Sequence, residues 1–178
     1  MPAPILHTPR LTLRPHLRSD MDTFWTFFQG DRAGYVSAPA TRSQLWYGFA
    51  SEVGSWDLMG HGGWGVDLKD GTFIGQVAIG QPPHFPELEI GWIVFDGHEG
   101  QGYAQEAATA ALHWAWGALP IDTLVSYIHP GNTRSIALAE RLGAQHDPDA
   151  PRPDGETPAE TLVYRHRPDA DGSPEAYA

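Results

Sequence analysis

The sequence predicts an α/β domain with a mixed, mainly antiparallel sheet flanked by helices. Two strand-like segments, 62–69 and 72–80, are joined through an Asp-Gly dipeptide, which is typical of a β-hairpin. Two segments with helical spacing, 103–116 and 132–144, each lie between strand-like segments and are predicted to be crossover helices. Hairpins combined with crossovers indicate a mixed sheet, and they exclude a doubly wound nucleotide-binding fold.

One strand and two helices are predicted before the hairpin. Segment 10–17 alternates leucines with polar residues, as a half-buried strand does. Ser19, with Asp22 three residues later, is expected to cap a helix in a capping-box arrangement. The apolar face of this helix carries three phenylalanines, Phe24, Phe27 and Phe28. Segment 43–56 is aromatic and interrupted by glycines, so we expect a short helix with a mobile flank.

Three further strands are predicted after the hairpin, at 88–95, 122–130 and 160–167. The loop 81–86 contains prolines and is not expected to pair. Asn132 is expected to cap the second crossover helix, and Gly143 to end it. Residues 168–178 have little to bury and are expected to form a disordered tail, which leaves 1–167 as a single domain.

Length and composition limit the class of protein. The 178 residues suit one ordinary domain, and 41% of them are hydrophobic. No stretch approaches the ~18 uninterrupted apolar residues that a membrane helix needs, and the chain does not open with a signal-peptide pattern. Cysteine is absent, which removes disulfides, thiolate metal sites and a cysteine nucleophile. A cytoplasmic protein without a membrane partner is expected.

The charge of the chain bears on its partners. The formal net charge is −11, with Lys69 as the single lysine. Nucleic acid is not expected as a partner, because phosphate binding needs a cationic surface. The acidic field would attract a cationic acceptor such as an amine, although acidity also serves solubility alone. The nine histidines show no metal-binding spacing, so no metal is expected.

The junction between strand 88–95 and helix 103–116 is rich in glycine. The first-turn amides of a helix lack intrahelical partners, and together with the helix dipole they form an anion site. Gly97, Gly100 and Gly102 leave room for a ligand and permit positive φ. The loop therefore predicts a phosphate ligand, with a tight connection that binds nothing as the alternative. Neither a P-loop nor a dinucleotide fingerprint fits, since Tyr-Ala and Gln105 stand at the required positions.

The segment GHEGQGYAQEA resembles motif A of the GNAT (GCN5-related) N-acetyltransferases, whose loop holds the pyrophosphate of acetyl-coenzyme A. TPRLTLRPHLRSDMD resembles the opening of the RimJ/RimL-like branch, GTFIGQVAIG its central hairpin strand, LEIGWIV its fourth strand and NTRSIALAERLGA its motif B helix. These fragments occur in the family's order and cover residues 8–167. The resemblance implies a GNAT-type acyl-CoA N-acyltransferase fold. It also implies an enzyme that moves the acetyl group of acetyl-CoA to a primary amine.

The resemblance implies a cofactor-binding role for two segments. The pantetheine arm would pair with the backbone of Trp92, Ile93 and Val94. The pyrophosphate would meet the amides of the loop, which are those of Glu99, Gly100, Gln101, Gly102, Tyr103 and Ala104. Asn132 resembles a family asparagine that contacts the cofactor arm, with a helix cap as the alternative role. Gly97 stands where the family often has Arg or Gln, so one side-chain contact fewer is expected.

Two residues are candidates for the chemistry. Glu89 resembles the acidic residue that several members use as general base, and it shares a strand face with Gly91. A solvated glutamate is the alternative, and Glu87, His84 and His129 are further candidates. The tyrosine that often protonates the leaving thiolate is replaced by Ala139. Ser135, or solvent, would then supply the proton.

Several functional alternatives stay open on the sequence. Since no cysteine can carry an acetyl intermediate, direct transfer in a ternary complex is expected. The acceptor would be a protein N-terminus or a small amine or amino-acid derivative, and a homodimer is a candidate assembly in this family. The competing class is a non-catalytic acyl-CoA-binding regulatory domain. Aromatic residues that could shape access to the acceptor, or only pack, are Trp46, Tyr47, Trp56 and Trp64.

Overall fold

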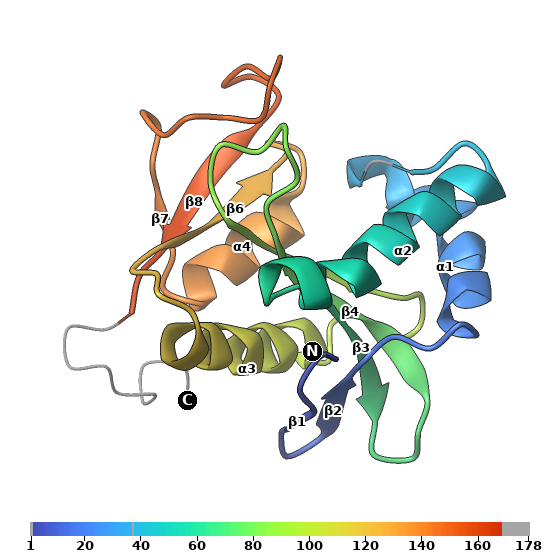
Figure 1. Ribbon diagram of the computed structural model, residues 1–178. Helices are drawn as coiled ribbons and strands as arrows, with labels where there is room; N and C mark the ends of the chain where they lie inside the picture. Colours follow the sequence, from blue (N-terminus) through green and yellow to red (C-terminus); the bar gives the residue numbers. More distant parts are fainter. Residues whose placement is uncertain (1, 37, 169–178) are drawn as a thin grey trace.

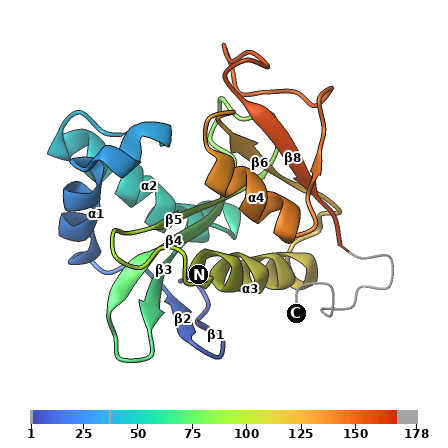
Figure 2. The same ribbon diagram turned by 180° about the vertical axis from the view of Figure 1, so that it is seen from behind.

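The computed structural model describes residues 2–36 and 38–168, shown from two sides in Figures 1 and 2. One eight-stranded sheet has the order β1-β2-β3-β4-β5-β6-β8-β7. Its neighbouring strands pair antiparallel except for β5 and β6, which confirms the predicted mixed, mainly antiparallel sheet. The strands are β1 (Leu6–His7), β2 (Leu11–Arg14), β3 (Gly63–Leu68), β4 (Phe73–Gly80), β5 (Glu89–Val94), β6 (Leu124–Ile128), β7 (Gln145–His146) and β8 (Leu162–His166).

Helices cover both faces of the sheet. They are α1 (Asp20–Phe28), the short 3-10 helix η1 (Asp31–Tyr35), α2 (Arg42–Met59), α3 (Tyr103–Ala118) and α4 (Thr133–Arg141). Strand side chains alternate between faces, so Val77, Ile79 and Ile90 are fully buried in the cluster that includes α3. The α3 side of this contact is rich in alanine, which allows a close approach of helix and sheet. The opposite face of β4 and β5 is left for α2 and for a cavity.

The structure corrects the predicted start of α1. Ser19 does not cap the helix with its side chain, because its own dihedral angles (φ −63°, ψ −26°) are already helical. The capping-box prediction for Ser19 and Asp22 is therefore wrong. The Asp20 carboxylate instead accepts a hydrogen bond from the Leu17 N–H. The predicted phenylalanine face is confirmed, with Phe24 and Phe27 buried and Phe28 packed against them.

The prediction of a short helix at 43–56 with a mobile flank is also wrong. α2 is one continuous helix of 18 residues that begins after Thr41 and ends at Met59, with Gly60 as its C-cap. The Thr41 hydroxyl accepts from the Gln44 N–H, and the Gln44 side chain accepts from the Thr41 N–H. This capping box fixes the first turn. It outweighs the helix-weakening glycines inside the segment.

The other predicted elements are present within a few residues of their expected bounds. The hairpin connection is longer than the expected two residues, since Leu68 N donates to the Thr72 carbonyl across a turn in which Gly71 has a φ of 87°. Asn132 caps α4 as predicted, accepting from the Ser135 N–H. Two short strands, β1 and β7, and the helix η1 were not predicted. The tail prediction lies outside the described residues, apart from Pro168.

No helix in the described part of the chain is long and apolar enough to cross a membrane.

Candidate active site

The sheet opens between its two parallel strands, β5 and β6. They are paired in register at one position only, Glu89 with Val125. Beyond that position side chains replace the ladder: the Ser126 hydroxyl donates to the Ile90 carbonyl at 2.7 Å, and a Glu89 carboxylate oxygen accepts from the Tyr127 N–H at 3.3 Å. Figure 2 shows β6 and β8 diverging from β5. The two strands therefore separate where a continued sheet would have closed the gap.

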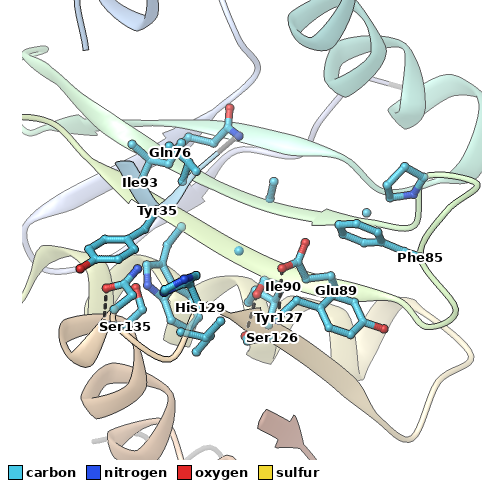
Figure 3. Close-up of a pocket in the computed structure, with 18 of the residues that line it drawn as sticks. Tyr35, Gln76, Phe85, Glu89, Ile90, Ile93, Ser126, Tyr127, His129 and Ser135 are labelled. Atoms are coloured by element: carbon cyan, nitrogen blue, oxygen red, sulfur yellow. Dashed lines mark hydrogen bonds between the residues drawn. The ribbon is translucent and has the colours of Figure 1, made fainter. Parts of the chain in front are cut away.

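A cavity of about 320 Å³ lies at this opening. On β4 and β5 the cavity is lined by three small residues, Ala78, Gly80 and Gly91, whose side chains leave space above the sheet. Figure 3 shows Phe85 and Glu89 toward one end and Tyr35 and Ser135 toward the other. The walls come from η1, α2, β6 and the start of α4, so elements far apart in the sequence enclose one space.

Glu89 lies in this cavity, on the same strand face as Gly91, as predicted. Its carboxyl group would be 3.9 Å from a Cβ placed on Gly91. Burial raises the pKa of Glu89 to about 7, the hydrogen bond from Tyr127 opposes the rise, and the charges of Glu52 and Glu156 add to it. A carboxyl group with this pKa exchanges a proton readily near neutral pH, which is what a general base requires. Its place in the cavity lining differs from the solvated sheet surface that was the alternative for Glu89.

A second carboxyl group, that of Glu52, lines the same cavity from α2. Burial raises its pKa, while the charge of His16 and a hydrogen bond with Gln76 act in the opposite direction. Glu52 is not predicted from the sequence, because α2 lacks a clear apolar stripe that would show which of its faces turns inward. A lone glutamate within an aromatic segment was the only signal.

Behind Glu52 lies a buried polar chain. The His16 side chain is fully enclosed, and its Nδ1 is 3.2 Å from the Asp20 carboxylate. Arg14 pairs with Asp20 at 2.6 Å and with Asp67 at 2.7 Å. Burial disfavours the charge on Asp20, but the hydrogen bonds from His16, Arg14 and the Leu17 N–H prevail and hold its pKa at about 2. Asp20 therefore remains ionised and fixes the orientation of the His16 ring.

Most of the other predicted site residues on β5 and α4 reach the cavity. Trp92, Ile93, Asn132 and Ser135 line it, whereas Val94 pairs with Gly75 in the sheet and is not part of the lining. Asn132 accepts a hydrogen bond from the Ser135 N–H at 3.2 Å, so its capping role is observed directly. Ala139, at the position of the family tyrosine, is fully buried.

The glycine loop lies at the N-terminus of α3, away from the cavity lining. Gly97, Gly100 and Gly102 have positive φ values of 85°, 73° and 80°, which confirms the conformation expected of them. The loop segment from Glu99 to Ala104 therefore runs directly into the first turn of α3, where backbone amides lack intrahelical partners. Arg10 braces this segment, since its guanidinium donates to the Gln101 carbonyl and lies over the Tyr103 ring.

The further candidates are placed differently. Glu87 forms two hydrogen bonds with Arg165, at 2.6 and 2.9 Å, and His84 packs on Phe85. Neither of these two lines the cavity, whereas His129 does, with its ring beside that of Tyr35.

Of the two alternatives for the aromatic residues of 46–64, packing applies to two of the four. Trp56 and Trp64 are in the hydrophobic core, and Trp46 and Tyr47 are exposed on the outside of α2. None of the four lines the cavity. The face of α2 that carries Glu52 turns toward the cavity, and the helical twist directs Trp46 and Tyr47 elsewhere.

Comparisons with known proteins agree with this architecture. The family model described as an acetyltransferase (GNAT) domain matches residues 10–145. The crystal structure of an acetyltransferase from Agrobacterium tumefaciens is 43% identical, with a TM-score of 0.87, over 94% of this chain and 96% of that chain. RimL, a ribosomal α-N-protein acetyltransferase in complex with coenzyme A, has a TM-score of 0.74 over 94% of this chain and 100% of its own. At 16% identity, that similarity concerns the fold.

A curated relative is the uncharacterized protein YkkB of Bacillus subtilis, 34% identical over 100 residues. The match covers 52% of this chain and 58% of that protein, so it spans less than two thirds of the relative's length.

Proposed function

The chain belongs to the GNAT acetyltransferase family, and from this premise we propose that it moves the acetyl group of acetyl-CoA directly to a primary amine. The observation that carries the proposal is the position of Glu89. Its carboxyl group lies in a cavity at the opening between β5 and β6, with its pKa raised to about 7. This is a proton acceptor at a place where two substrates can meet.

The chain offers a fitting site for each part of acetyl-CoA. Beyond Glu89 and Val125, β5 and β6 no longer pair in register, so the backbone of Trp92, Ile93 and Val94 borders the opening on one side. A pantetheine arm, which is an extended chain with two amides, would bind along this backbone. The amides from Glu99 to Ala104, freed by the positive φ of the glycines, would hold the pyrophosphate. Asn132 would contact the arm from the start of α4.

The reaction needs one base and one source of a proton. The amine nitrogen attacks the thioester carbonyl carbon and forms the new C–N bond, and the nitrogen loses a proton to the Glu89 carboxylate. The C–S bond then breaks, and the thiolate takes a proton from the Ser135 hydroxyl or from solvent. Because the chain has no cysteine to carry the acetyl group, both substrates would be bound together in a ternary complex.

The acceptor would be a protein N-terminus, by similarity to RimL, or a small amine or amino-acid derivative. The proposal includes the RimJ/RimL-like branch, a cytoplasmic location and a homodimer as candidate assembly, all from the same resemblance. One observation favours a second function. Ala139 replaces the usual tyrosine and is buried, which would suit a non-catalytic acyl-CoA-binding regulatory domain.

Calorimetric titration with acetyl-CoA, and with acetyl-pantetheine as a control without the pyrophosphate, tests the cofactor half of the proposal. A thiol-release assay over amines and N-terminal peptides then tests the transfer. We expect micromolar binding that depends on the pyrophosphate, and thiol release with at least one amine. Binding without transfer to any amine would favour the regulatory domain. If millimolar acetyl-CoA does not bind, the proposed function is wrong.

A further inference from the structure

Two carboxyl groups face one cavity, Glu89 from β5 and Glu52 from α2. We propose that Glu52 determines acceptor specificity by binding a second positively charged group of the acceptor, so that the preferred acceptors are short diamines. This inference rests on the proposed function, because it concerns the acceptor half of the same cavity. Three features of the molecule support it: the charges around the cavity, the spacing of the two carboxyl groups and the buried histidine behind Glu52.

The cavity offers these two carboxylates no strong cationic partner. Within the described residues, no lysine or arginine belongs to the lining, and His129 is the one histidine in it. The charge of Glu52 contributes to the raised pKa of Glu89, so the two groups repel each other when both are ionised. A ligand with two ammonium groups would neutralise both carboxylates at once and remove that repulsion.

The spacing of the carboxylates can be followed on the sheet. Gly63, Ala78 and Gly91 are direct neighbours across β3, β4 and β5, so Gly63 and Gly91 are two strand spacings, about 10 Å, apart. A Cβ on Gly63 would be 2.5 Å from a Glu52 carboxylate oxygen, and a Cβ on Gly91 would be 3.9 Å from that of Glu89. Ala78 lies between them on this row of the sheet, and Gln76, one step along β4, lines the cavity and is hydrogen-bonded to Glu52. A short aliphatic chain with a cation at each end suits this surface.

A buried histidine lies behind Glu52. Nδ1 of His16 is hydrogen-bonded to the Asp20 carboxylate, which fixes the orientation of the ring. Nε2 is buried without a hydrogen-bond partner, and it lies 3.2 Å from the same Gly63 Cβ position that Glu52 approaches. Burial raises the pKa of Glu52, and the charge of His16 opposes this effect by lowering it.

The test compares putrescine, a diamine, with butylamine, the monoamine of the same chain length. Thiol release gives kcat and KM for both acceptors in the unmodified protein, in Glu52→Gln and in Gly63→Ala. The Gly63 variant retains Glu52 but displaces its carboxylate, because the added methyl group would collide with the flexible end of that side chain. Asp57→Asn is the matched control, since it removes an exposed charge from the same helix outside the cavity.

We expect kcat/KM to favour putrescine by at least about tenfold in the unmodified protein, the gain of one charge-assisted contact. Glu52→Gln and Gly63→Ala should raise the KM for putrescine and bring the ratio close to one, whereas Asp57→Asn leaves the ratio unchanged. Equal kcat/KM values in the unmodified protein, or an unchanged ratio in Glu52→Gln, overturn the inference.

Calorimetric titration with putrescine in the presence of coenzyme A separates this inference from the proposed function. Putrescine binding that is lost in Glu52→Gln, in a protein that acetylates no amine, supports the cation site and contradicts the enzymatic function. If amines are acetylated but putrescine binds the unmodified protein and Glu52→Gln with equal affinity, the proposed function is supported and the inference about Glu52 is wrong.

Discussion

The Arg10 guanidinium donates a hydrogen bond to the main-chain carbonyl of Gln101, with 2.9 Å between Nη1 and the oxygen. In a planar trans peptide the C=O and the next N–H point in opposite directions. Fixing the Gln101 carbonyl on Arg10 therefore turns the Gly102 N–H to the other side of the loop. Glu106 holds Arg10 in place by accepting from both its backbone N–H and its side chain. The first hairpin of the chain thus sets the direction of an amide in the glycine loop.

Arg10→Ala should weaken acetyl-CoA binding by roughly tenfold, because the loop amides would lose their fixed direction. Calorimetric titration with acetyl-CoA measures this. Arg42→Ala is the control, since Arg42 is an equally charged, exposed residue whose ion pair is with Asp22. Equal affinity in Arg10→Ala and the unmodified protein would show that the brace does not orient the loop.

Glu89→Gln should lower kcat by about 100-fold or more, as expected for loss of a general base, while acetyl-CoA affinity is retained. The pKa of Glu89 is raised to about 7. The kcat/KM of the unmodified protein divided by that of Glu89→Gln should therefore rise as the pH increases through 7. The titration of the amine itself is common to both proteins and cancels in this ratio. A pH-independent ratio would exclude Glu89 as the base.

Glu89→Gln should also change the pH dependence of stability. The raised pKa means that the folded state favours the protonated carboxyl group, so stability is complete below the unfolded value near 4.5 and falls as the pH rises through about 7. Glutamine stays neutral. We expect the free energy of unfolding of Glu89→Gln to exceed that of the unmodified protein by about 1–3 kcal/mol at pH 8 and to match it at pH 4. Urea unfolding at both pH values checks the sign.

Gly75→Ala should destabilise the folded protein by disturbing the pairing of β4 with β5, the strand that borders the opening. Gly75 pairs with Val94, and a methyl group there would collide with the backbone carbonyl of Ile93, which cannot move without shifting β5. We expect a loss of about 2–4 kcal/mol, comparable to overpacking in a core or slightly above it, together with weaker acetyl-CoA binding. In Gly117→Ala, on open α3 surface, the helix should gain stability. Equal stability of the two variants would contradict this account of β5.

Local chemistry explains why some predictions from the sequence are correct. An asparagine before a helix can cap it by its own hydrogen bond, so Asn132 was predicted from its neighbours alone. Glycines between a strand and a helix have few other uses, and their positive φ values were expected. Ser19 shows the limit of this reasoning, because its side chain could cap only if the preceding turn had left its backbone extended.

The order of elements, the mixed sheet and the glycine loop were therefore determined by the sequence itself, since each follows from patterns along single strands, turns or helices. Glu89 became a candidate base through the resemblance of its strand to the GNAT family. Glu52 and His16 were not predicted from the sequence, because their meeting over Gly63 depends on how α2 and the segment before α1 pack on β3. The opening between β5 and β6 likewise depends on side chains of both strands. Only tertiary packing decides which faces of separate elements share one cavity, and so only it could pair the two carboxyl groups.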